Sequence, residues 1–188
     1  MGPVRRGGRA INIRGDLLTW SEAVGARGTR WREALEHDGR LLRALLLEST
    51  DAGRPARLEM TTQAGLLTLH PEPDESAMHG NVVGADGVRH LAFPWSAEHD
   101  LQVFGSTAAL TATLRRLDRL IPAGEAHTLD LLQIDDDLTP RPARWSFERI
   151  SQREWRLQDT DGPAERRFTT EDDGRPILAD AVTWPLEA

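Results

Sequence analysis

The chain of 188 residues is 39% apolar and 28% charged, a profile typical of one globular domain with a sizeable core. It contains no cysteine, and all 23 of its basic residues are arginine, which excludes thiol catalysis, thiolate metal sites, P-loops and Schiff-base chemistry. The formal net charge of −7 argues against a dedicated nucleic-acid binder.

The N-terminal residues 1–9 combine arginine, glycine and proline, and they predict a flexible, solvated arm. No apolar stretch follows these basic residues, as a secretory signal would require, and no apolar run approaches the roughly 20 residues of a membrane helix. We therefore expect a cytoplasmic protein without membrane insertion, in which residues 10–188 form a single domain.

The first half of this domain has the alternating apolar and polar pattern of half-buried strands. The pattern is clearest over residues 29–37, where Trp31, Glu33 and Leu35 alternate with more polar residues. Asp38-Gly39 then predicts a two-residue hairpin turn. The run Arg40–Ser49 is apolar on both faces, and we favour a strand over a short helix because a turn follows it directly.

Further strand-like runs continue along the chain, mostly separated by short turns rich in aspartate and glycine. An acidic loop over 71–78 contains two prolines, which bar a central strand, and Pro140–Pro142 is interpreted as a linker. The predicted strands are residues 10–24 with a break at Gly15, and then 54–62, 66–70, 81–83, 88–95, 101–104, 127–134, 144–150, 153–158, 166–170 and 175–184.

One amphipathic helix is predicted over about 106–121. Ser106 or Thr107 can cap it, leucines recur at helical spacing up to Ile121, and Pro122 ends it. Because consecutive strands with short links pair antiparallel, the fold class is mainly β (α+β). We expect an antiparallel β-meander curled into a roll or open barrel, with the helix covering one mouth.

Histidines gather in the middle of the chain, at His70, His79, His90 and His99. Several imidazoles together can hold a metal or act as acid and base. No pair has a local ligand spacing such as two histidines four apart on a helix. The pattern therefore favours histidines that belong to the scaffold, and leaves a small metal-dependent or acid/base hydrolase as an alternative.

The aromatic residues indicate a function more clearly than the histidines do, because indole rings stack on sugars and line apolar pockets. Core filling is the simplest interpretation of these rings, yet a roll with this many strands encloses more interior than one helix fills. We assign no catalytic residue, metal or cofactor. The candidate ligand-binding residues are Trp31, His79, His90, Phe93, Trp95, Trp145, Phe147 and Trp155.

The layout resembles a bacterial glycolipid-binding protein family with a spiral β-roll fold. The resemblance lies in Leu41–Trp95, in the run Leu114-Arg115-Arg116-Leu117, and in Phe168–Trp184 with its closing tryptophan. More loosely, the layout is similar to half-barrel lipoprotein carriers. The resemblance implies lipid binding inside a β-roll, and it supplies no catalytic residues.

The first hypothesis is thus a non-catalytic protein that binds a lipid, a glycolipid or another apolar ligand in the interior of a β-roll. The hydrolase centred on the four histidines is the alternative. A structural or interaction protein, which could form dimers through its edge strands, is a second alternative.

Overall fold

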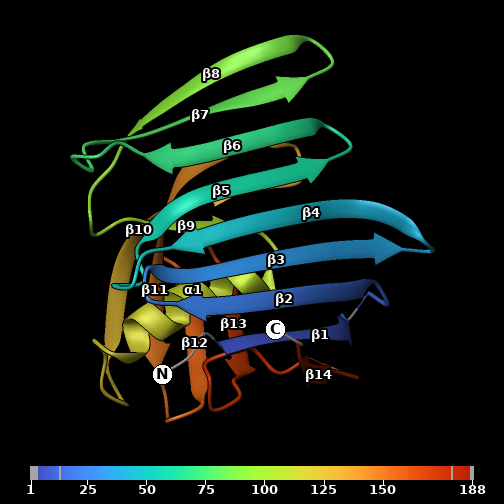
Figure 1. Cartoon of the computed structure of the whole chain (residues 1–188). Coiled ribbons are helices and arrows are strands. Elements are labelled where there is room, and N and C mark those ends of the chain that lie inside the picture. The colour runs from blue at the N-terminus through green and yellow to red at the C-terminus, as the bar shows by residue number, and fades with distance from the viewer. Residues whose placement is uncertain (1–3, 13, 179, 187–188) are drawn as a thin grey trace. The chain divides into compact units, whose positions relative to one another are not determined.

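The computed structural model describes residues 4–12, 14–178 and 180–186, and these form fourteen strands and one helix. The strands belong to two sheets, and the chain divides into two compact units. The first unit lies within residues 1–97, 136–138 and 178–188, and the second within 98–135 and 139–177. The predicted class, a mainly antiparallel β protein with one helix, is confirmed (Figure 1).

The first unit is an antiparallel sheet of nine strands in the order β14-β1-β2-β3-β4-β5-β6-β7-β8. Eight of these strands follow one another along the chain as a meander (Figure 1). The strands are β1 (Val4–Ile11), β2 (Leu17–Gly25), β3 (Gly28–His37), β4 (Arg40–Ser49), β5 (Pro55–Thr62), β6 (Gly65–Pro71), β7 (Ala77–Gly84), β8 (Gly87–Pro94) and β14 (Val182–Pro185).

The two faces of this sheet differ in burial. Along β4, Arg43, Leu45 and Leu47 are buried while the residues between them are partly exposed, as the two-residue period of a strand requires. We call the face that carries Leu45 and Leu47 the buried face, and the opposite one the exposed face. The prediction of a strand rather than a helix for Arg40–Ser49 is confirmed.

The predicted N-terminal arm is wrong for residues 4–9, because these residues belong to β1, which pairs with both β2 and β14. Residues 1–3 of that segment lie outside the described residues. The reason is a contact remote in sequence: Trp20 lies opposite Gly8, and a Cβ on Gly8 would come within 2.6 Å of indole atoms. The ring of Trp20 thus packs directly on a glycine that composition alone assigns to a flexible segment.

The turn between β1 and β2 is held by Asp16. The Asn12 side-chain amide donates to one carboxylate oxygen over 2.9 Å, and Nδ1 of His37 lies 2.8 Å from the other. These hydrogen bonds, that of Asn12 above all, hold the pKa of Asp16 below its ordinary value of 3.8. The charged form of Asp16 therefore stabilises this corner of the sheet.

Replacing Asp16 with asparagine should lower the melting temperature at neutral pH. A carboxyl with a depressed pKa stabilises the fold above its unfolded pKa of about 3.9, and this contribution is lost as the pH falls through the lower folded value. The difference in melting temperature between wild type and Asp16→Asn should therefore shrink as the pH drops below about 4. A difference that stays constant from neutral to acidic pH would contradict this role.

The second unit is a sheet of five strands in the order β13-β12-β11-β10-β9, with one helix, α1 (Thr107–Asp118). The side chain of Ser106 caps the helix, accepting from the backbone N–H of Ala109 over 3.1 Å, as predicted. The strands are β9 (Asp100–Val103), β10 (Ala126–Ile134), β11 (Pro140–Arg149), β12 (Glu154–Asp159) and β13 (Glu165–Thr169).

Two sequence predictions for this unit need correction. Strands β9 and β10 pair parallel, because α1 connects them and returns the chain to the starting edge, which a short turn cannot do. The predicted linker at Pro140–Pro142 is instead the start of β11, paired with β10. Proline is tolerated there because it begins the strand.

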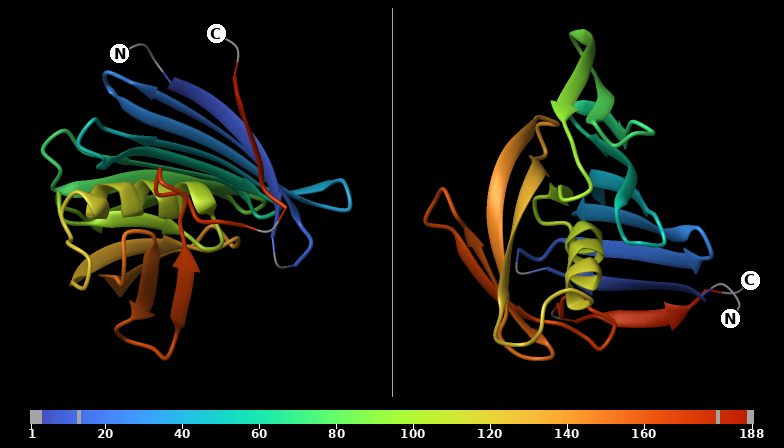
Figure 2. Two further views of the ribbon diagram at one scale, coloured as in Figure 1. Left: turned by 90° about the horizontal axis from the view of Figure 1, so that it is seen from below. Right: turned by 90° about the vertical axis from the view of Figure 1, so that its left-hand side faces the viewer.

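The core of the second unit lies between α1 and its sheet. Figure 2 shows the helix against one face of this curved sheet. The helix contributes Leu114 and Leu117, and Ile121 follows it. The buried sheet residues in this cluster are Leu129, Leu131, Trp145, Phe147, Trp155 and Leu157. In the part of the chain that is described, no helix is long and apolar enough to span a membrane.

Candidate ligand-binding face

Two tryptophans and two glutamates form a compact group on the buried face of the first unit. Trp20 and Glu22 lie two residues apart on β2, and Trp31 and Glu33 lie two residues apart on β3. The strand register places Trp20 opposite Glu33 and Glu22 opposite Trp31. Opposite residues on antiparallel strands have Cβ atoms about 5 Å apart, so indoles and carboxylates alternate at the corners of a square. We call this group the Trp–Glu square.

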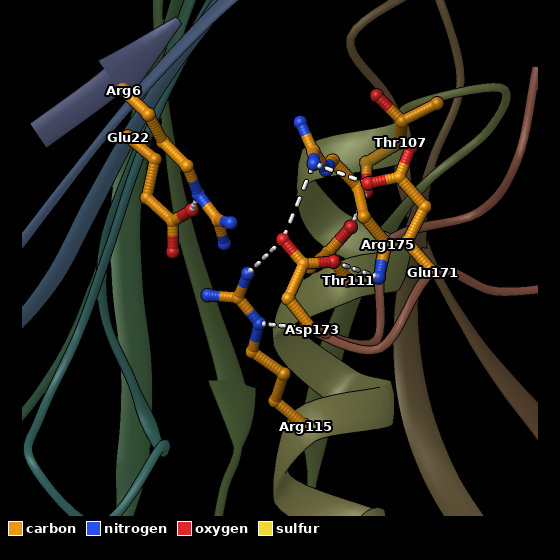
Figure 3. A network of polar contacts seen from close by, with 8 residues as sticks. All are labelled: Arg6, Glu22, Thr107, Thr111, Arg115, Glu171, Asp173 and Arg175. Carbon is orange, nitrogen blue, oxygen red and sulfur yellow. Dashed lines mark hydrogen bonds and ion pairs between the residues drawn. The ribbon is translucent and has the colours of Figure 1, made fainter. Parts of the chain in front are cut away.

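Both carboxylates of the square are buried and carry arginine partners. Glu22 is 2% exposed, and its carboxylate lies 2.7 Å from Nε of Arg6 on β1. Figure 3 draws the two side chains of this ion pair. Glu33 is 3% exposed and lies 3.2 Å from Nη2 of Arg43, whose Nη1 donates to Asp136 over 3.2 Å. Burying charge is costly unless it is paired, so these arginines allow two carboxylates to persist in an apolar face.

The square borders an extended group of buried apolar residues. On β4, Leu47 lies opposite Trp31 and Leu45 lies opposite Glu33. The same face continues across the next three strands. The further buried residues on it are Leu58, Met60, Leu67, Leu69, Met78 and Val82. A polar group and an aliphatic surface thus adjoin within one sheet.

The chemistry of this face suits an amphiphile. Carboxylates only accept hydrogen bonds, so they bind groups such as hydroxyls that donate. Indole faces add apolar contact against sugar rings or chains, and the buried leucines suit an aliphatic tail that displaces the segments covering them.

The eight residues predicted from the sequence are divided between the two units. Trp31 belongs to the square. Trp145, Phe147 and Trp155 lie together in the core of the second unit. Phe93 is half-buried at the end of β8 opposite Met78, and Trp95, buried just beyond it, donates its backbone N–H to the carbonyl of Ser76 over 3.1 Å.

His70, His79 and His90 lie on the exposed face of the first unit. His70 and His79 are directly opposite one another on β6 and β7, and His90 lies opposite Asn81 on β8. Nε2 of His79 is 3.0 Å from Glu72, and Nδ1 of His90 is 2.6 Å from the Asn81 side chain. His79 and His90 therefore face away from Trp31.

Over residues 4–12, 14–178 and 180–186, no group of three or more histidines and carboxylates is placed to hold a metal ion. His99 belongs to the second unit, where its carbonyl accepts from Arg116 over 3.2 Å. Beside it, Arg116 pairs with buried Asp100 over 3.1 Å. Desolvation raises the pKa of Asp100, and Arg116 opposes that rise.

A second polar network, in the second unit, connects helix α1 to the loop after β13 (Figure 3). Nε of Arg115 donates to the carbonyl of Asp173 over 2.6 Å. The side chain of Arg175 lies 2.7 Å from Glu171 and 3.2 Å from Asp173. Every charge in this network has a partner inside the same loop or on the adjacent helix, so the network fastens the loop to α1.

Alternation in the sequence places Trp31 and Glu33 on one face, but it does not connect them with Trp20, Glu22 or the arginine partners. A signal was present: the tetrapeptide pattern Trp-x-Glu-Ala occurs at Trp20–Ala23 and again at Trp31–Ala34. On consecutive strands of a hairpin, two copies of this pattern place four large side chains on one face. Arg43 and Asp136 are 93 positions apart, and no local pattern connects them.

No protein-family model matches the sequence, and no curated protein matches it. A solved structure does share the fold. It is a DUF1089 family protein (PA1994) from Pseudomonas aeruginosa, similar with a TM-score of 0.62 and 16% sequence identity. The match covers 86% of this chain and 88% of that chain. At this identity the likeness concerns the fold alone.

Proposed function

We propose that this protein binds an amphiphile with a hydroxyl-rich head, of the glycolipid class, on the buried face of the nine-stranded sheet. The observation that carries the proposal is the Trp–Glu square, which adjoins a leucine-rich surface in the same sheet. Once the segments that cover this buried face move apart, Glu22 and Glu33 accept hydrogen bonds from the head group, the indoles of Trp20 and Trp31 pack on it, and the leucines contact the tail.

The carboxylates are the basis for choosing this head group. A phosphate or carboxylate head offers no hydrogen-bond donor to Glu22 and Glu33, whereas sugar hydroxyls can donate to both. Arg6 and Arg43 hold the carboxylates in place. The histidine-centred hydrolase has no comparable support, because His79 and His90 lie on the exposed face with local partners.

Tryptophan fluorescence provides the test, because Trp20 and Trp31 form half of the square. A dodecyl maltoside titration below its micelle concentration should give a saturable change, and a dodecyl phosphocholine titration should not. Glu22→Gln should weaken maltoside binding about tenfold or more, since a hydrogen bond to a charged group contributes about 1.5–3 kcal/mol.

Glu59→Gln is the matched control, because Glu59 lies on the exposed face of β5. It removes the same charge and should leave the affinity unchanged. The proposal fails if no lipid or glycoside in a panel gives a saturable change, or if both variants weaken binding equally. As a binding protein, the chain should release its ligand chemically unchanged, which mass spectrometry of the extracted ligand checks.

A further inference from the structure

An arginine-rich depression lies on the exposed face of the first unit, near the hairpin that joins β2 and β3. Its volume is about 570 Å³, and its lining includes Arg5, Arg27 and Arg30. Arg5 and Arg30 directly precede Arg6 and Trp31, whose side chains lie on the buried face. Because successive strand residues point to opposite faces, this depression is separate from the Trp–Glu square.

The strand register brings the arginines within reach of a common ligand. Arg5 on β1 and Arg30 on β3 both lie opposite Ala23 on the intervening strand β2. Two strand spacings separate their Cα atoms by about 10 Å, and the small side chain of Ala23 leaves the space between them open. Arg27 belongs to the turn between the same two strands and lines the same depression.

Among the described residues that line this depression, the carboxylates do not balance the arginines. Glu48 is the acidic residue in its lining, and its carboxylate accepts a hydrogen bond from Nε of Arg30 over 2.6 Å. Arg5 and Arg27 are exposed and have no side-chain partner among the residues that the structure describes. Three arginines against one glutamate leave this lining positive in a chain whose net charge is −7.

We propose that the depression binds a phosphate group, with Arg5 and Arg27 as its principal ligands. A guanidinium group matches phosphate oxygens through paired N–H donors and keeps its charge at any physiological pH. Arg30 adds a third cation, already oriented by Glu48. The phosphate can belong to a soluble phosphorylated compound or to a phospholipid head group, since both present the same oxygens.

The test compares two double variants that carry the same change of charge. Arg5→Gln/Arg27→Gln removes the two arginine charges of the depression that have no side-chain partner among the described residues. Arg9→Gln/Arg40→Gln removes two exposed arginines elsewhere in the same unit and serves as the control. All four side chains are exposed, so both variants should keep the wild-type melting temperature.

Two probes distinguish the sources of phosphate. Inorganic pyrophosphate is titrated by calorimetry, and vesicles of phosphatidylcholine with or without phosphatidylglycerol are tested by co-sedimentation. At low salt, Arg5→Gln/Arg27→Gln should weaken binding about 25-fold, from roughly fivefold per arginine, and the control double variant should stay within about twofold of wild type.

Pyrophosphate binding that the Arg5→Gln/Arg27→Gln variant loses identifies a soluble phosphorylated ligand. Binding confined to phosphatidylglycerol vesicles and lost in the same variant identifies a phospholipid. The proposal is overturned if wild type binds neither probe, or if the two double variants weaken binding to the same extent.

Discussion

Replacing Arg43 with methionine is expected to lower the free energy of unfolding by about 3–5 kcal/mol. Arg43 and Glu33 are 2% and 3% exposed, and their side chains are 3.2 Å apart. Methionine fills most of the arginine volume but leaves the carboxylate of Glu33 buried without its guanidinium partner. The cost is therefore an uncompensated charge rather than a cavity.

The double variant Arg43→Met/Glu33→Leu distinguishes the cost of a buried, uncompensated charge from the cost of a cavity. Replacing both members of a buried ion pair with apolar residues is often close to neutral, so the second substitution should recover most of the stability lost in the first. Urea unfolding followed by tryptophan fluorescence measures all variants. A double variant that is less stable than Arg43→Met would contradict the assignment.

Arg30→Met is the matched control for this series. Its side chain is 57% exposed and pairs with Glu48 on the exposed face of the same strands. An exposed ion pair contributes roughly 0–1 kcal/mol, so this variant should unfold close to wild type. The difference in free energy of unfolding between Arg43→Met and Arg30→Met then measures the effect of burial on the ion pair, because the residue type, the kind of partner and the substitution are the same.

The fold class follows from the sequence because its signals are local. Alternation around Trp31, the Asp38-Gly39 turn and the spacing of Leu114 and Leu117 each depend on residues close together in the chain. These predicted β3, the β3–β4 hairpin and α1, and all three are present. In a meander, strands that are neighbours in sequence are also neighbours in space. Local sequence patterns therefore predict much of the strand pairing in this protein.

The errors occur where pairing is remote. β1 looks disordered by composition, and it forms because Trp20 covers Gly8 and because β14, at the other end of the chain, pairs with it. The parallel pairing of β9 with β10 depends on where α1 places the chain, which strand patterns do not encode. In both cases the decisive interaction is absent from the segment itself.

The candidate site was predictable only in part, for the same reason. Trp31 and Glu33 share a face by simple alternation, and the second Trp-x-Glu-Ala copy at Trp20 completes the square once the β2–β3 register is known. The arginine partners come from β1 and β4, and their contacts follow from the register of further strands. A glutamate that shares the buried face of a predicted strand with leucines is the sequence signal for an arginine partner.

In the second unit, Phe147→Ala is expected to lower the free energy of unfolding by about 3–5 kcal/mol. Phe147 is 0% exposed and belongs to the cluster in which Leu114 and Leu117 of α1 pack against the sheet. Removing the ring loses its burial and leaves a cavity that close-packed neighbours fill poorly. The substituted residue lies on β11, paired with β10 and β12, so the strand itself should persist.

Phe104→Ala makes the same chemical change at a site that is 44% exposed. The ring of Phe104 lies 4.5 Å from the guanidinium carbon of Arg166, a contact that contributes about 0.5–1 kcal/mol at an exposed position. Because Phe104 also buries less of its ring, Phe147→Ala should cost clearly more than Phe104→Ala in urea unfolding. Equal losses would mean that the cluster around Phe147 does not stabilise the second unit. A large loss confined to Phe147→Ala identifies the contact between α1 and its sheet as the core of that unit. The candidate ligand-binding residues Trp145, Phe147 and Trp155 then stabilise this core.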